Sequence, residues 1–170
     1  METLILGLIY FKANPQESTF WTSYIATIPQ SFDSLIFWTM DELGCLGSQN
    51  LVSRLERRKS KIARLYEHLS LVLQKSIDTT STQESSLCQE LTLESFTWAY
   101  AAVMSRSVFV DGNSLSKSPL RLYKNNAALP PFLDFFNHVN DTTCTAGFST
   151  KSQCYELRTE GAWKSGDQVF

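Results

Sequence analysis

The clearest alternation of hydrophobic and polar positions lies between Gln49 and Leu73. Apolar residues recur there at intervals of three and four, which is the spacing of one face of an α-helix. We therefore predict a long amphipathic helix with a basic outer surface. Its apolar positions are Leu51, Leu55, Ile62, Leu65, Leu69 and Val72, and its basic positions are Arg54, Arg57, Arg58, Lys59, Lys61 and Arg64. A solvated face is the common reason for such a basic surface, and an acidic or nucleic-acid partner is the alternative.

Other segments also carry helical signals. Asn14-Pro15 ends the first helix, because a residue before proline avoids helical backbone angles. Thr92 is a capping residue for the last helix. The predicted helices cover Leu4 to Phe11, Ser18 or Thr19 to Ile25, a short turn opening at Asp41-Glu42, and Leu93 to about Arg106. Polar composition predicts loops at Ile77 to Gln89 and at Asp111 to Asn126.

The pattern changes near the end of the chain. Thr145 to Ser149 and Cys154 to Thr159 are short β-prone runs separated by a polar turn, which predicts a hairpin. Lys164 to Asp167 is typical of a turn, and Gln168 to Phe170 of the start of a strand. Helices followed by a short antiparallel hairpin predict a helix-rich α+β fold.

Composition narrows the class of protein. The chain has 170 residues, 43% of them hydrophobic and 19% charged, so it fits one folded domain. A net charge of -2 favours no nucleic-acid partner. Four scattered cysteines and two histidines make no metal site and favour reduced thiols. The apolar start has no basic flank and is too short to span a bilayer, so we expect a soluble protein of the nucleus or cytoplasm.

The candidate chemistry lies between Ala127 and Asn140. Two prolines and an apolar run lead to Asn137-His138. An amide and an imidazole beside apolar walls are typical of a small-molecule pocket. A buried turn with a capping asparagine and a satisfied core histidine is the alternative. Arg106 has two interpretations as well, a cation at a helix end or a group that reaches into a site.

Four segments in this order resemble the SET-domain methyltransferases, in the branch of the plant Rubisco large-subunit lysine methyltransferase. They are Phe20-Trp-x-x-Tyr-Ile-x-x-Ile-Pro29, Phe96-x-Trp-Ala-x-x-x-Val-x-x-Arg106, Ala128-Leu-Pro-Pro-Phe-Leu-Asp-Phe-Phe-Asn-His138, and Tyr155-Glu-Leu-Arg-Thr159 through Trp163-x-x-Gly-Asp-Gln-Val-Phe170. The segments cover most of the chain outside its two polar loops.

The resemblance implies a protein-lysine methyltransferase that uses S-adenosylmethionine and acts as a monomer on a histone or another protein. It implies that Arg106, Asp134, Asn137 and His138 contact this cofactor, and that Pro131, Phe135 and Phe136 are mostly packing residues. It also implies a partial SET domain, with an N-terminal helical part at 1–48, a helical insertion and loop at 49–90, and a C-terminal part at 91–170.

The resemblance further implies that parts of the family's site lie outside this sequence. The tyrosine of the methyl-transfer channel would follow Phe170, so no catalytic residue is assigned within the chain. The Gly-x-Gly loop against the cofactor would precede Met1. We therefore expect the isolated chain to be inactive. The alternative is a non-catalytic fragment that binds a partner through the basic helix.

This expectation predicts that calorimetry detects no binding of S-adenosylmethionine to the isolated 170-residue chain, because half of the family's site is outside it. A micromolar dissociation constant that is lost in Asn137→Ala would contradict the prediction.

Overall fold

The computed structural model describes residues 1–77, 87–111, 125–137, 144–159 and 161–168. The chain divides into two compact units, Glu2–Ser105 and Arg106–Phe170, and each is described by itself. The first unit is helical and the second carries the described strands, so the predicted helix-rich α+β class is confirmed.

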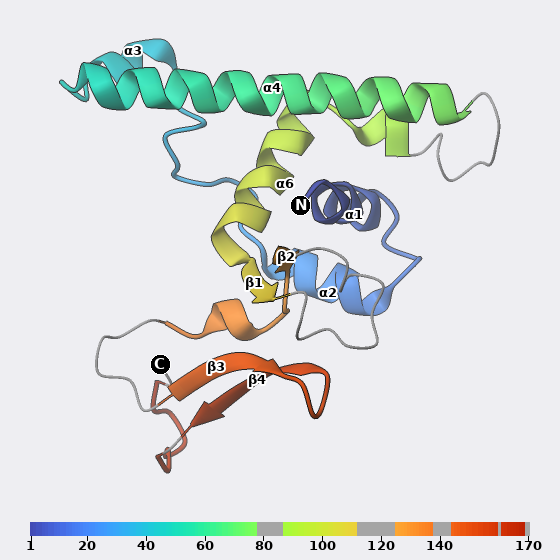
Figure 1. Cartoon of the computed structure of the whole chain (residues 1–170), viewed down its shortest axis with the longest axis vertical. Helices are drawn as coiled ribbons and strands as arrows, with labels where there is room; N and C mark the ends of the chain where they lie inside the picture. The colour runs from blue at the N-terminus through green and yellow to red at the C-terminus, as the bar shows by residue number, and fades with distance from the viewer. Residues whose placement is uncertain (78–86, 112–124, 138–143, 160, 169–170) are drawn as a thin grey trace. The chain divides into compact units, whose positions relative to one another are not determined.

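The first unit contains one long helix, with α1, α2 and α6 below it in the view and the short α3 above one of its ends (Figure 1). The helix α6 starts beneath the middle of α4 and runs away from it at a steep angle. The bounds are α1 Glu2–Ala13, α2 Thr19–Thr27, α3 Met40–Gly44, α4 Gln49–Ile77 and α6 Leu93–Arg106. All the helices predicted from the sequence are present, with ends within a few residues of those expected.

Local capping explains where the short helices begin. The Ser18 hydroxyl accepts a hydrogen bond from the backbone N–H of Trp21 and so starts α2. Thr39 and Glu42 form a reciprocal capping box that starts α3, and this hydrogen bonding to the Thr39 backbone lowers the pKa of the Glu42 carboxyl. At α6 the Thr92 hydroxyl accepts from the N–H of Ser95 at 3.1 Å, as the sequence predicted.

The core of the first unit forms around α6. Phe96 is fully buried, and its ring lies 6.0 Å from that of Tyr66 in α4. The Trp98 indole N–H donates to the carbonyl of Pro29 at 2.9 Å, which ties the segment after α2 to α6. The Lys12 ammonium of α1 lies 3.9 Å from the centre of the Trp98 ring, a cation–π contact.

The long helix α4 covers five of its six predicted apolar positions, Leu51, Leu55, Ile62, Leu65 and Leu69. A stripe of covered positions advances along it in alternating steps of three and four, at Val52, Leu55, Lys59, Ile62, Tyr66, Leu69 and Leu73. Val72, predicted on the apolar face, is 46% exposed because it lies one position, roughly 100° of helix rotation, off this stripe. Lys59, predicted on the basic surface, lies in the stripe, where its ammonium donates to the carbonyl of Trp38. No helix of the described residues is long and apolar enough to cross a membrane.

The segment predicted as a loop from Ile77 to Gln89 is helical at its described end. Residues 87–90 form a helical turn, closed by the N–H of Leu91 on the carbonyl of Leu87 at 3.0 Å. Burial of Leu91 holds this turn in place, which the polar composition of the segment did not indicate. Residues 78–86 of the predicted loop lie outside the described residues.

The second unit contains two separate two-stranded sheets. The strands β1 Val108–Asp111 and β2 Asn125–Ala128 pair antiparallel, and the 3₁₀ turn η3 Leu133–Phe135 follows them. The strands β3 Cys144–Ser149 and β4 Cys154–Thr159 form the hairpin that the sequence predicted. The predicted turn at Lys164 is closed by its N–H donating to the Asp167 carboxylate at 2.8 Å. Gln168 is in no strand, and residues 169–170 of that prediction lie outside the described part.

The prediction of a surface loop from Asp111 to Asn126 was wrong at both ends. Asp111 closes β1, and Asn125 and Asn126 open β2, with Asp111 opposite Asn125 in the ladder. Asn and Asp are depleted in strands, so the composition masked a pairing that backbone hydrogen bonds and flanking residues stabilise. Residues 112–124, the middle of that loop, lie outside the described residues.

Replacement of Phe96 tests the core of the first unit. Phe96→Ala is expected to lower the free energy of unfolding by about 3–5 kcal/mol, because it empties a fully buried aromatic site. Chemical denaturation followed by tryptophan fluorescence measures the loss. The matched control is Phe20→Ala in α2, where the side chain is 52% exposed and a loss below about 1 kcal/mol is expected. Equal losses for the two variants would refute this assignment of the core.

Candidate functional site

Two of the predicted site residues meet in the structure. The Arg106 Nε lies 2.9 Å from the Asp134 Oδ2, and the two side chains are only 17% and 9% exposed. A carboxylate and a guanidinium shielded in this way attract one another more strongly than an exposed pair does. Arg106 is therefore held by a specific partner and is more than a cation at a helix end.

The β1–β2 hairpin explains why residues so far apart in sequence meet. Arg106 is the last residue of α6, and a single residue separates it from the start of β1. Asp134 comes after β2 and after the two prolines at 130 and 131. In the ladder Val108 lies opposite Ala128, so the chain leaves β2 at the end where it entered β1. The backbone then turns at Phe132, which has a left-handed φ of 74°, and η3 carries Asp134. Antiparallel pairing thus brings the two charges to the same end of the hairpin.

Asn137 and His138 follow this turn in the sequence. Asn137 is exposed and lies in no helix or strand, so a buried turn, the alternative interpretation of the sequence, is wrong for Asn137. His138 lies outside the described residues. The structure therefore brings Arg106 and Asp134 together and leaves Asn137 three residues further along, with its amide open to solvent.

The aromatic residues of this segment are not packed as predicted. Phe135 is 51% exposed and Phe136 38% exposed, although both were expected to be packing residues. The described part of this unit contains only two-stranded sheets, and a two-stranded sheet has no second layer to cover an adjoining aromatic segment. Beside the Asn137 amide there is consequently an open apolar surface.

A polar cluster on the β3–β4 hairpin was not singled out in the sequence. The Glu156 carboxylate accepts hydrogen bonds from the Ser152 hydroxyl at 2.5 Å and from the Arg158 guanidinium at 2.5 and 3.0 Å. These bonds, first from Ser152 and then from Arg158, lower the pKa of Glu156 to about 2. Positions i and i+2 of a strand share a face, so the Glu-x-Arg spacing of β4 was a usable signal. The hairpin stabilises itself with these contacts.

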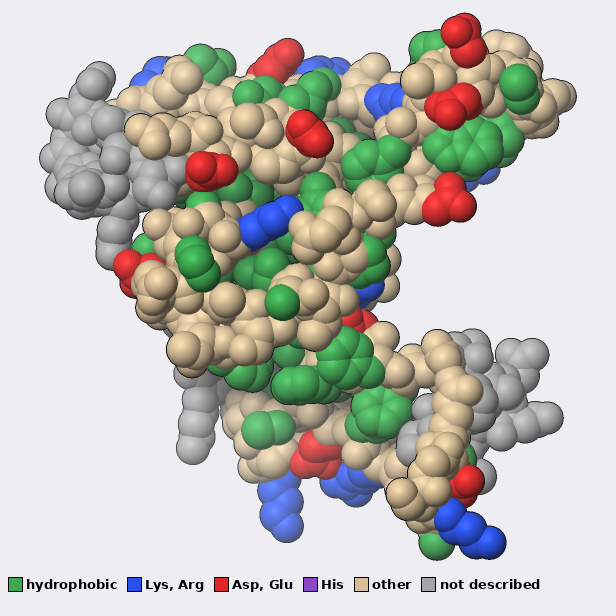
Figure 2. All heavy atoms as spheres, turned by 180° about the vertical axis from the view of Figure 1, so that it is seen from behind, with side chains coloured by type: hydrophobic (Ala, Val, Ile, Leu, Met, Phe, Trp, Pro, Cys, Tyr) green, Lys and Arg blue, Asp and Glu red, His purple; other side chains and the backbone are tan. Residues whose placement is uncertain are grey.

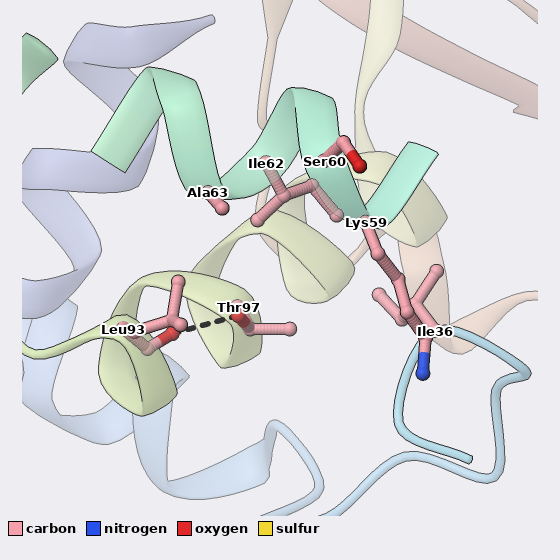
Figure 3. Close-up of a pocket in the computed structure, with 7 residues that line it drawn as sticks. All are labelled: Ile36, Lys59, Ser60, Ile62, Ala63, Leu93 and Thr97. Carbon is pink, nitrogen blue, oxygen red and sulfur yellow. Dashed lines mark hydrogen bonds between the residues drawn. The ribbon is translucent and has the colours of Figure 1, made fainter. Parts of the chain in front are cut away.

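A cavity of about 370 Å³ lies in the helical unit, between α4 and α6 (Figure 3). Its lining is mostly apolar, and in the figure the Lys59 side chain extends from α4 toward Ile36. The Thr97 hydroxyl donates to the Leu93 carbonyl at 2.7 Å within the same wall. The lining residues are Ile36, Lys59, Ser60, Ile62, Ala63, Leu93 and Thr97. None of the four predicted site residues is among them.

Among the described residues, no three His, Cys, Asp or Glu side chains gather in a way that could hold a metal ion.

Comparison with known proteins shows which proteins this chain is related to. A search with models of known protein families finds no match. Among curated proteins, SET domain-containing protein 4 of Artemia parthenogenetica is 30% identical over 181 residues, which cover 99% of this chain and 39% of that protein. The chain is related to the SET-domain methyltransferases. The resemblance predicted from the four sequence segments is thereby confirmed.

Two further relatives carry a more specific name. The actin-histidine N-methyltransferases of Gallus gallus and Mus musculus are each 26% identical, over 168 and 167 residues, which cover 99% and 98% of this chain. The chain spans 39% of the length of the Artemia relative and 26% of the length of these two. The latter two are named for methylation of a histidine in actin, whereas the family resemblance implied lysine as the acceptor.

A double-mutant cycle on Arg106 and Asp134 tests their ion pair. Arg106→Met and Asp134→Asn are each expected to destabilise the β1–β2 hairpin by roughly 2–4 kcal/mol, because each leaves the other charge shielded and uncompensated. The double variant should lose less than the sum of the two. Hydrogen exchange of the β1 and β2 amides measures these losses.

The exposed pair of Arg158 and Glu156 supplies the control. The Arg158 side chain is 73% exposed, so Arg158→Met should change the free energy of opening of its own hairpin, measured by hydrogen exchange of the β3 and β4 amides, by less than about 1 kcal/mol. Additive effects of the Arg106 and Asp134 variants would show that the two groups do not interact.

Proposed function

We propose that this chain forms part of the cofactor site of a protein methyltransferase that uses S-adenosylmethionine and methylates a lysine side chain. The observation that carries the proposal is the order of the site residues. Arg106 ends a helix, Asp134 pairs with it, and Asn137-His138 follow, in a chain whose likeness to a SET-domain relative extends over 99% of its length. A protein substrate, a histone among the candidates, and a nuclear or cytoplasmic location belong to the same proposal.

The residues present suit a nucleoside-like cofactor. The exposed Asn137 amide has two donors and one acceptor, and open aromatic surface lies beside it at Phe135 and Phe136. A purine needs this combination, since its ring is flat and apolar and its edge takes directional hydrogen bonds. Asn137 and His138 are the groups that we propose hold the cofactor.

The ion pair has a positioning role in this proposal. Because Arg106 and Asp134 already compensate one another at 2.9 Å, neither charge is free of a partner when the cofactor arrives. The pair anchors η3 to the start of the hairpin, and Asn137 follows η3 after one residue. An anchored turn reduces the entropy lost when Asn137 engages a ligand. A direct contact of Arg106 or Asp134 with the cofactor remains a prediction of the family resemblance.

The chemistry requires a neutral acceptor nitrogen. When bound, S-adenosylmethionine supplies a methyl group on a sulfonium, a positively charged centre with a thioether as leaving group. The acceptor lone pair forms the new carbon–nitrogen bond, and the carbon–sulfur bond breaks. Lysine, with a pKa of about 10.4 in water, must lose its proton to solvent before the transfer. Partial burial and a nearby cation both favour the neutral amine.

Histidine is the second candidate acceptor, because two relatives of this chain are named actin-histidine N-methyltransferases. An imidazole with a pKa of about 6.5 is already largely neutral at pH 7.5. Transfer to histidine would therefore need no deprotonating environment, and its rate should level off above pH 7. Transfer to lysine should continue to rise with pH above 8.

The proposal is tested with the protein that carries this chain, radiolabelled S-adenosylmethionine and a cell extract as acceptor. Asn137→Ala is expected to lower methyl transfer at least tenfold through a raised KM for the cofactor, because a directional contact is lost. Asn50→Ala, a change at an exposed position of α4 remote in sequence from the site, should leave transfer unchanged. Mass spectrometry of the labelled protein identifies the modified residue. Transfer that is unchanged in Asn137→Ala would refute this site.

A further inference from the structure

The outer face of α4 carries a concentration of positive charge that its packing does not use. Five exposed cations lie within eleven residues, at Arg54, Arg57, Arg58, Lys61 and Arg64. Their spacing of one, three and four places them on one side of the helix. In Figure 2 blue side chains appear at several places along the top of the view, with red and green side chains between them. The whole chain has a net charge of -2, so this stripe is a local feature.

These cations are not neutralised by neighbouring carboxylates. In the part of the chain that the structure describes, no ion pair involves any of the five. The α4 residues Glu56 and Glu67 lie roughly 120° around the helix from the centre of the stripe. The Nε of Arg57 and that of Arg64 donate to carbonyls of α4 itself, at 3.2 and 3.3 Å. The pKa of the Glu2 carboxyl is lowered first by a hydrogen bond to its own backbone, and the charge of Lys61 is the weakest of the influences on it.

Such a stripe weakens the free helix. Like charges three or four positions apart on a helix repel one another, as at 54 and 58, 57 and 61, and 61 and 64. An anionic partner would remove this repulsion on binding, and the guanidinium groups suit carboxylates because they can bind them through two parallel hydrogen bonds.

A depression beside the cations indicates, independently of their charge, that the partner also has an apolar side chain. A depression of about 210 Å³ lies along the stripe, lined by Leu51, Arg54, Leu55 and Arg58. Leu55 belongs to the core cluster around Leu43 and Leu51 packs against that cluster, so the floor is fixed by packing. An apolar floor between two guanidinium groups matches an aliphatic side chain that is flanked by carboxylates. A sugar-phosphate backbone supplies no aliphatic side chain, so the chemistry favours a peptide over nucleic acid.

We propose that the outer face of α4 binds an acidic amphipathic segment of another protein. The stripe from Arg54 to Arg64 is about 15 Å long, which matches three turns of a partner helix. Its carboxylates, spaced by three and four residues, would pair with the arginines, and one leucine or isoleucine would enter the depression beside Leu51 and Leu55. This inference is independent of the proposed methyl transfer.

Fluorescence anisotropy with a labelled fifteen-residue helical peptide tests the proposal on the 170-residue chain. The probe carries glutamates at helical spacing and one leucine stripe, and we expect micromolar binding in 50 mM salt that weakens severalfold in 200 mM salt. Replacing its glutamates by glutamine should abolish binding, and replacing its leucines by serine should weaken binding at least fivefold. Binding that ignores the leucines would overturn the proposal.

Charge-matched variants of the chain complete the test. Arg54→Glu, Arg57→Glu and Arg58→Glu together should weaken peptide binding at least tenfold. Lys75→Glu, Lys151→Glu and Lys164→Glu together make the same change in net charge at exposed sites elsewhere and should weaken it less than twofold. Circular dichroism verifies that α4 stays helical, and a triple Arg→Gln variant replaces the first set if it does not. Equal weakening by both sets, or tighter stripe-dependent binding of a DNA duplex, would overturn the proposal.

Discussion

Burial of one face of α6 is the constraint on which the helical unit depends. Phe96, Ala99 and Val103 lie three and four residues apart and are fully shielded from solvent. Small side chains at Ala99 and Ala102 let other segments approach closely, and removing this much apolar surface from water is the main driving force available to a helical unit. The Trp98 indole adds a directional hydrogen bond to the Pro29 carbonyl, so the connection after α2 has one position against α6. Without this face, α1, α2 and α4 would have no common surface on which to pack.

The second unit depends less on hydrophobic burial than the first and more on polar interactions. Its described strands form two-stranded sheets, and such sheets gain little from hydrophobic burial. Val110 and Leu129 are its buried apolar residues among those described. Polar interactions are correspondingly important, and the Arg106–Asp134 pair and the hydrogen-bonded Glu156 are the main ones. The proposed cofactor residues follow the first of these in sequence, and in the proposed function the same pair has a positioning role.

The long helix α4 has a packed face and a charged face at different angles around its axis. Its covered stripe advances in steps of three and four, and its cations occupy the opposite side. Lys59 is the exception, since it lies within the covered stripe and satisfies its charge with a backbone carbonyl. The helix can therefore pack against its own unit and present charge to a partner without a conflict between the two. The proposed docking surface and the proposed cofactor site also rest on different residues.

The sequence by itself determined the features that depend on local physics. The helices, a cap at Ser18 or Thr19, the cap at Thr92 and the hairpin of β3 and β4 depend on neighbouring residues and were predicted from them, and the structure selects Ser18 as the cap of α2. Motif order was likewise sufficient to reveal the SET-domain relationship. The tertiary structure alone decided the features that depend on distant partners. Pairing of β1 with β2, in a segment of strand-poor composition, brought Arg106 to Asp134. Packing on α4 decided that Lys59 is covered and Val72 exposed, because a helical pattern specifies a face only to within one position, and the neighbours that cover it specify the rest.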